Sequence, residues 1–151
     1  MTAIVLWGKG GTGKTSTLKA VIKNLLDQGA IIAQDCTKDR RDDLCLILKF
    51  NGKKIAISTD GDCKSIVKAN FKDLDETKEP YDLFIGASHS WGETCKGIKD
   101  RFSNPDDKIL WYRVGGIDAS GFSKPFLEST VYTLVHNHQA DCIVELIKSV
   151  L

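Results

Sequence analysis

Apolar residues follow two alternating patterns along the chain: short continuous runs, and longer stretches with an apolar residue every three or four positions. The first run, residues 3–7, is followed directly by a glycine and is typical of a strand buried on both faces of a parallel sheet. Helical spacing then predicts a helix over residues 14–28, ended by Gly29, before a second run at 30–33. This order has the length of one βαβ unit, for which we expect a right-handed crossover.

The next two β-rich segments, residues 44–50 and 53–59, are separated only by Asn51 and Gly52. Both residues tolerate positive φ, which a two-residue hairpin turn requires. The sequence therefore predicts an antiparallel hairpin inserted into the parallel sheet.

The rest of the chain continues to alternate between helical and strand patterns, which predicts one domain over residues 1–151 with a three-layer α/β fold and a mostly parallel sheet. A break in the last helix near Asn137 is one alternative. The remaining predicted elements are a helix that Asp62 caps and Pro80 ends, a strand at 82–87, a helix at 94–102, a strand at 108–114, a glycine-rich loop at 115–125 and a helical tail at 126–151.

Composition narrows the class of protein without choosing a function. The 21 basic and 20 acidic side chains are mixed along the chain, so the net charge of +1 gives no electrostatic reason to expect nucleic acid or an acidic membrane as a partner. No apolar run approaches the roughly 20 residues that span a bilayer. Five cysteines without a Cys-x-x-Cys pair argue against a disulfide framework or a zinc site. We expect a cytoplasmic protein.

The segment between the first strand and the first helix has the Gly-x-x-x-x-Gly-Lys-Thr spacing of a phosphate-binding loop. Its glycines allow successive backbone amides to point inward at the positive end of the helix dipole. A lysine adds a charge for the β- and γ-phosphate oxygens, and a threonine hydroxyl is available to Mg²⁺. We expect Mg²⁺ and a nucleoside triphosphate to bind here. The expected binding residues are Gly8, Lys9, Gly10, Gly11, Thr12, Gly13, Lys14, Thr15 and Ser16.

This loop resembles that of the P-loop nucleoside triphosphatase superfamily, over about the first 35 residues. Its sequence from Lys9 to Thr15 is similar to the deviant loop of the nitrogenase iron protein and the chromosome-partitioning ATPases. In those families the early lysine, here Lys9, reaches across a dimer to the partner's nucleotide. The resemblance therefore implies ATP as ligand and a homodimer through Lys9.

An acidic residue near Mg²⁺ is expected after a strand, because open α/β sheets bind ligands at the carboxyl ends of their strands. Asp35, Asp60 and Asp62 meet this condition, whereas Asp82 begins its strand. We rank Asp60 first and Asp35 as its alternative. The Gly61 amide is expected to contact the γ-phosphate, so that this segment senses the nucleotide; the other interpretation is an ordinary turn and helix cap.

Two further features concern base preference and catalysis. The hairpin and the segment that follows it are similar in placement to the switch of small GTPases, but Ser58 stands where the switch aspartate belongs. No Asn-Lys-x-Asp element that reads guanine follows, which favours adenine. His89 and Glu93, after the strand at 82–87, are candidates for a general base or for positioning water.

Three functions share this loop. The first is a Mg²⁺-dependent ATPase or nucleotide switch, in which Lys14, Asp60 and His89 act in turnover. The second is a small-molecule or nucleotide kinase, with an acceptor held by the loops at 36–43, 88–94 and 115–125 and with Arg40 and Arg41 as the only hint of a lid. The third is a nucleotide-binding interaction module with negligible turnover.

Overall fold

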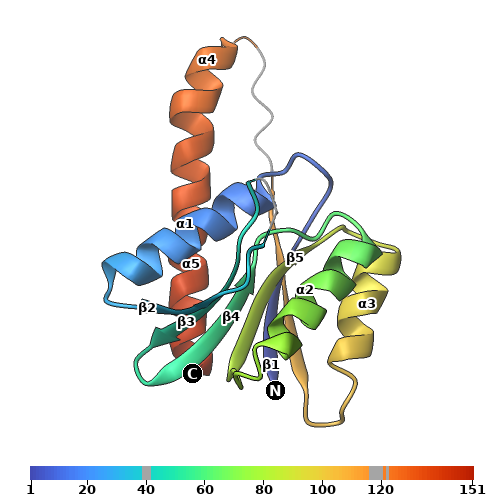
Figure 1. The fold of residues 1–151 in the computed structure, drawn as a ribbon. Helices are drawn as coiled ribbons and strands as arrows, with labels where there is room; N and C mark the ends of the chain where they lie inside the picture. The colour runs from blue at the N-terminus through green and yellow to red at the C-terminus, as the bar shows by residue number, and fades with distance from the viewer. Residues whose placement is uncertain (39–41, 116–120, 122) are drawn as a thin grey trace.

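The computed structural model describes residues 1–38, 42–115, 121 and 123–151, which form an α/β structure around a six-stranded mixed sheet (Figure 1). In chain order its elements are β1 (Thr2–Trp7), α1 (Lys14–Asp27), β2 (Ile31–Asp35), β3 (Cys45–Phe50), β4 (Lys53–Ser58), α2 (Lys64–Glu76), β5 (Leu83–Ser88), α3 (Glu93–Arg101), β6 (Lys108–Arg113), α4 (Lys124–Phe126), a π-helical turn (Leu127–Val131) and α5 (Tyr132–Val150).

The strands are ordered β2-β3-β4-β5-β1-β6 across the sheet. β1 is parallel to β5 on one side and to β6 on the other, and β4 is parallel to β5. β3 runs antiparallel to both β2 and β4. The predicted hairpin is confirmed: Asn51 and Gly52 have φ of 50° and 78° in the turn that joins β3 to β4.

The position of β2 differs from the βαβ expectation. β2 follows α1 in the chain, but it lies at the edge of the sheet, with β3, β4 and β5 between it and β1. The reason is that β2 pairs with the first strand of the inserted hairpin and not with β1. With neighbouring strands about 4.8 Å apart, four spacings put β2 roughly 19 Å from β1.

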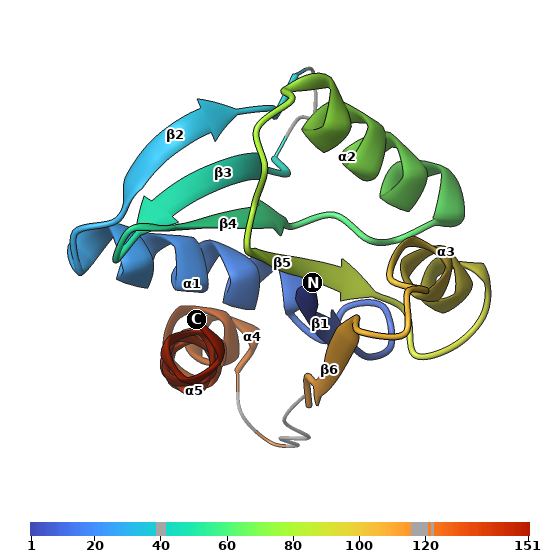
Figure 2. The same ribbon diagram turned by 90° about the horizontal axis from the view of Figure 1, so that it is seen from below.

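Helices cover both faces of the sheet: α1 and α5 one face, α2 and α3 the other (Figure 2). The α1–α5 face is mainly aliphatic, with Leu18 and Leu25 of α1 packed in one cluster with Ile143 and Ile147 of α5. The α2–α3 face contains three phenylalanine rings whose centroids lie 4.8–5.9 Å apart. Burial of both strand faces explains why the central strands are continuous apolar runs.

The carboxyl-terminal helical segment is longer than its packed part. α5 continues without interruption through Asn137, so the irregularity lies at the π-helical turn before it and not at the predicted break. α5 is buried against the core only from Ala140 onward, and the helix before that point projects beyond the ends of the strands (Figure 1). Leu134 on this projecting part is 65% exposed. Within the described ranges, we find no helix with the length and apolar character needed to cross a membrane.

Candidate functional site

The glycine-rich loop joins the end of β1 to the first turn of α1, and its backbone depends on its glycines. Gly11 and Gly13 have φ of 76° and 86°, a region that residues with a side chain rarely adopt. A Cβ on Gly8 would lie 3.0 Å from the carbonyl oxygen of Val114, next to β6. The loop therefore curls closely over the ends of β1 and β6 and places the amino end of α1 beside it.

Lys14 is folded into this loop. Its side chain is 5% exposed, and its Nζ donates hydrogen bonds to the carbonyl oxygens of Gly8, at 3.2 Å, and Lys9, at 3.0 Å. Burial lowers the pKa of Lys14, while the negative charge of Asp62 acts to raise it. The loop thus holds an amine with few water contacts, whose charge an incoming anion would stabilise further.

Thr15 connects the loop to the end of β4. Its Oγ1 donates a hydrogen bond of 3.1 Å to the backbone carbonyl oxygen of Thr59. The Thr59 hydroxyl donates to Asp43 at 2.8 Å and accepts from the Leu44 amide at 2.9 Å, which anchors this carbonyl group. Because its proton is used in this way, the Thr15 hydroxyl keeps its lone pairs available for a cation.

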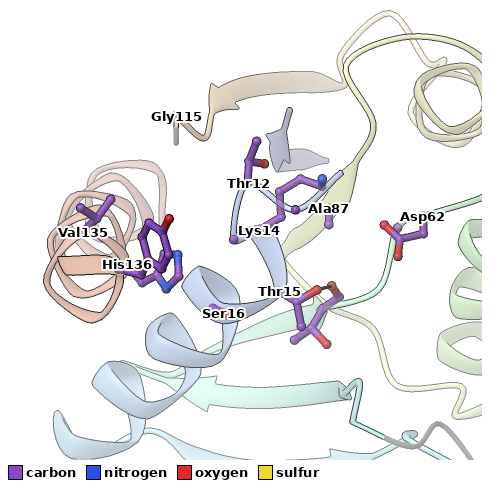
Figure 3. Close-up of a pocket in the computed structure, with 14 residues that line it drawn as sticks. Thr12, Lys14, Thr15, Ser16, Asp62, Ala87, Gly115, Val135 and His136 are labelled. Carbon is purple, nitrogen blue, oxygen red and sulfur yellow. Dashed lines mark hydrogen bonds between the residues drawn. The ribbon is translucent and has the colours of Figure 1, made fainter. Parts of the chain in front are cut away.

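These groups open into one cavity of about 430 Å³, within the roughly 300–1,000 Å³ of ordinary ligand pockets. The loop and the first turn of α1 form its floor. Asp62 lies on one side and His136 and Val135, on α5, lie on the other (Figure 3). The other lining residues are Gly11, Thr12, Gly13, Lys14, Thr15, Ser16, Thr59, Gly61, Ala87, Gly115 and Tyr132.

The three candidate aspartates have different surroundings. Asp62 lines the cavity, but Asp60 does not. The Asp60 carboxylate accepts a hydrogen bond of 3.3 Å from the backbone amide of Asp62. The backbone carbonyl oxygen of Asp60 accepts another, of 2.8 Å, from the side chain of Asn70. Asp35 is exposed on the edge strand β2, and hydrogen bonds from Thr37 lower its pKa. The structure brings Asp62 to the loop and leaves Asp35 on the edge strand β2, with three strands between it and β1.

Asp62 does not cap α2 as predicted. The helix begins at Lys64 with Cys63 as its N-cap residue, and no side chain caps it. The preceding turn is fixed instead by Gly61: a Cβ there would lie 2.0 Å from the carbonyl oxygen of Ala87. Contact between Gly61 and the backbone of β5 brings the turn against the sheet and turns Asp62 toward the cavity (Figure 3).

His89 and Glu93, the candidates from the segment after β5, are placed differently from each other. His89 lies beside the loop, with its Cε1 3.8 Å from the position of a Cβ on Gly10, and its Nε2 is 3.7 Å from an Asp62 carboxylate oxygen. Glu93 forms an ion pair with Lys64, which lowers the pKa of Glu93. Both line a second cavity of about 380 Å³ that also includes Asp62.

The α5 wall was not predicted from the sequence. The imidazole of His136 packs on the loop so closely that a Cβ on Gly13 would lie 2.1 Å from its Nε2. Burial lowers the pKa of His136, because it disfavours the charged form of the ring. A signal was present: Tyr132, His136 and Ala140 are four residues apart and continue the helix face that Ile143 extends into the core.

The other predicted residues lie outside the cavity. The side chain of Lys9 is exposed at the outer part of the loop, and Lys9 takes part through its backbone oxygen. Two further arginines also lie outside the cavity: Arg101 pairs with Asp75, and Arg113 lies over the ring of Trp7. Arg40 and Arg41 are outside the described residues. In the described segments no three His, Cys, Asp or Glu side chains group as a metal site.

Comparisons with known proteins add no identity. No family model matches this chain, and neither a curated protein nor a solved structure matches it.

Proposed function

We propose that this protein has a three-layer P-loop fold and binds a nucleoside triphosphate, with ATP as the expected ligand, together with Mg²⁺ in the 430 Å³ cavity. The observation that carries the proposal is the meeting of three groups at one cavity. These are a loop of glycines at positive φ, a buried lysine amine, and a threonine hydroxyl oriented by Thr59. The amides of such a loop and the helix dipole behind it attract phosphate oxygens.

The chain's own residues divide the work at this site. Lys14 exchanges its two carbonyl partners for β- and γ-phosphate oxygens, and the loop amides hold the remaining charge. Thr15 and Asp62 are the residues that would hold Mg²⁺, an ion that takes oxygen ligands from few side chains and from phosphate. Bound there, the ion supplies positive charge that neutralises the triphosphate. Asp62 thus takes the role first assigned to Asp60.

Turnover, if the protein hydrolyses ATP, depends on the segment after β5. His89 sits between the loop and Asp62, which is the position of a group that orients water toward the terminal phosphate. One observation favours phosphate transfer as a second candidate function. The 380 Å³ cavity that shares Asp62 with the main cavity has room for an acceptor beside the same end of the triphosphate.

A thermal-shift panel tests the binding proposal. A ligand that binds only the native state adds about 2.7 kcal/mol of stability at 100 times its dissociation constant. We expect Mg-ATP to raise the midpoint, with smaller effects for ADP and for ATP without metal. GTP measures base preference. If none of these nucleotides raises the midpoint, the proposal is wrong.

Formation of ADP, measured together with free phosphate, then separates the candidate functions. ADP and free phosphate formed from Mg-ATP and water by the purified protein support an ATPase, whereas ADP that appears only with a candidate acceptor, together with the phosphorylated acceptor and without free phosphate, supports a kinase. Binding without either reaction, also in the presence of cell extract, supports an interaction module. The His89→Ala variant is the matched control, since it leaves Lys14 and Thr15 intact and should bind ATP while losing turnover.

A further inference from the structure

The cavity continues beyond the phosphate loop into a second hollow between α1 and α5. This hollow has a volume of about 360 Å³ and shares Ser16, Tyr132 and His136 with the main cavity. Polar side chains of Glu128, Thr133 and Asn137 also line it. The two hollows therefore form one path that leads from the loop along the face of α5 toward its projecting end.

The two ends of this path differ in chemistry. At one end lie the Thr15 hydroxyl, the Thr59 carbonyl group and the Asp62 carboxylate, which suit phosphate and a cation. At the other end lie the phenol of Tyr132 and the imidazole of His136, one helical turn apart. Aromatic faces accept a nucleobase by stacking, and hydroxyl, amide and carboxylate groups bond ribose hydroxyls.

We propose that the nucleoside part of the ligand lies in the groove between α1 and α5, with its base against Tyr132 and His136. The proposal rests on the proposed function and assigns the end of the site that binds the base. His136 contacts the loop at Gly13, and Tyr132 lies one turn farther along the groove. The triphosphate therefore extends from these rings across the loop toward Asp62.

Polar contacts fix this wall in place. The Thr17 hydroxyl on α1 donates a hydrogen bond of 3.2 Å to the Gln139 side chain on α5, whose amide nitrogen in turn donates to the Gly115 carbonyl oxygen. Two turns farther along α1, the side-chain amide of Asn24 donates a hydrogen bond of 2.6 Å to Asp141. These bonds set the rotation of α5 about its axis and so the direction of Tyr132 and His136.

The test compares two ligands by titration calorimetry: Mg-ATP, and Mg-tripolyphosphate, which has the phosphates without the nucleoside. Wild type is expected to bind ATP more tightly than tripolyphosphate. Tyr132→Ala should weaken ATP binding about 5- to 150-fold, the usual loss for one stacked base, and leave tripolyphosphate binding unchanged. Unchanged tripolyphosphate binding also shows that the variant is folded.

Two matched variants sharpen the comparison. Tyr132→Phe keeps the ring and should keep ATP affinity within about threefold, since stacking needs no hydroxyl. Leu134 lies on the same helix, but its side chain is 65% exposed and lines neither hollow. Leu134→Ala should therefore leave the affinities for both ligands unchanged.

The outcomes distinguish this inference from the function it builds on. If neither ligand binds wild type, the proposed function itself fails. If tripolyphosphate binds and Tyr132→Ala leaves ATP affinity unchanged, the nucleoside lies elsewhere and only the inference is overturned. Equal losses for both ligands also overturn it, because Tyr132 would then support the loop and not contact the base.

Discussion

The two walls of the cavity are built by different kinds of contact. On the β4–β5 side, Gly61 is pressed against a backbone carbonyl group, and a Cβ would lie 2.0 Å from the oxygen of Ala87. On the α5 side, Gly13 is equally close, but to the side chain of His136. A carbonyl group in a strand cannot move without distorting the sheet, whereas an imidazole can change rotamer. The β4–β5 wall is thus fixed by backbone, whereas the side chains of the α5 wall can adapt.

Loss of Lys14 should have the largest effect, because it removes the charge that both walls enclose. For Lys14→Ala we expect the stabilisation by Mg-ATP, about 2.7 kcal/mol at 100 times the wild-type dissociation constant, to be lost. The ligand-free midpoint should change little, since burial of the amine offsets its two hydrogen bonds to carbonyl groups. Thermal melts with and without nucleotide measure both effects. A strongly destabilised apo protein would show that Lys14 is structural.

The glycine pair tests the difference between the walls directly. Gly61→Ala should lower the free energy of unfolding by about 1–3 kcal/mol, and no neighbouring side-chain truncation should restore it, because the clash is with backbone. Gly13→Ala is destabilised both by its positive φ and by the clash with His136. The double variant Gly13→Ala/His136→Ala lacks the imidazole and should regain the part of the stability that the clash costs. Denaturant unfolding of Gly61→Ala, Gly13→Ala, His136→Ala and the double variant measures the coupling. Equal behaviour at both sites would contradict the comparison.

The two aspartates should separate binding from stability. Asp62→Ala removes an exposed carboxylate, so the free energy of unfolding should stay within about 0.5 kcal/mol while Mg-ATP affinity falls roughly tenfold. Asp60→Ala removes the acceptor of the Asp62 amide and should cost about 0.5–1.5 kcal/mol of stability. Calorimetric titration and denaturant unfolding of both variants check this. The reverse pattern would return the metal-supporting role to Asp60.

The smallest effect is expected where α5 is held to α1. Thr17→Val keeps the volume of a fully buried side chain but removes its hydrogen bond to Gln139. We expect the free energy of unfolding to fall by about 1 kcal/mol. The affinity for ATP should also fall, but the affinity for tripolyphosphate should not, because only the α5 wall changes. If the affinities for ATP and tripolyphosphate fall equally, α5 supports the loop and does not contact the nucleoside.

Local patterns predicted the elements well and their neighbours less well. The limits of α1 and the β3–β4 hairpin follow from apolar spacing and from Asn51 and Gly52, because these signals act within a few residues. The position of β2 depends on which strand pairs with it, and an apolar run does not specify its partner. The same limit explains why β2, although correctly located in the sequence, carries Asp35 away from the loop.

The parts of the candidate site that are contiguous in sequence were the easier ones to predict. Residues 8–15 are recognised by the spacing of their glycines, lysine and threonine, but the choice between Asp60 and Asp62 depends on the direction in which one turn faces. That direction is set by contact between Gly61 and β5, which a turn signal does not reveal. Tyr132 and His136 lie more than 110 residues from the loop, and only the continuation of the α5 face connects them to it.

In mechanical terms, the carboxyl-terminal helical segment is a cantilever. Its clamp, the fixed part, is the buried stretch from Ala140 to Ile147. Its arm, the free part, extends beyond the ends of the strands (Figure 1). From Asn137 to Lys124 the arm is about 20 Å long at 1.5 Å per residue, so a tilt of about 5° at the clamp moves its tip by roughly 2 Å. His136 lies on the arm next to the clamp and packs on Gly13, so a displacement of the helix at this point would be larger at the tip.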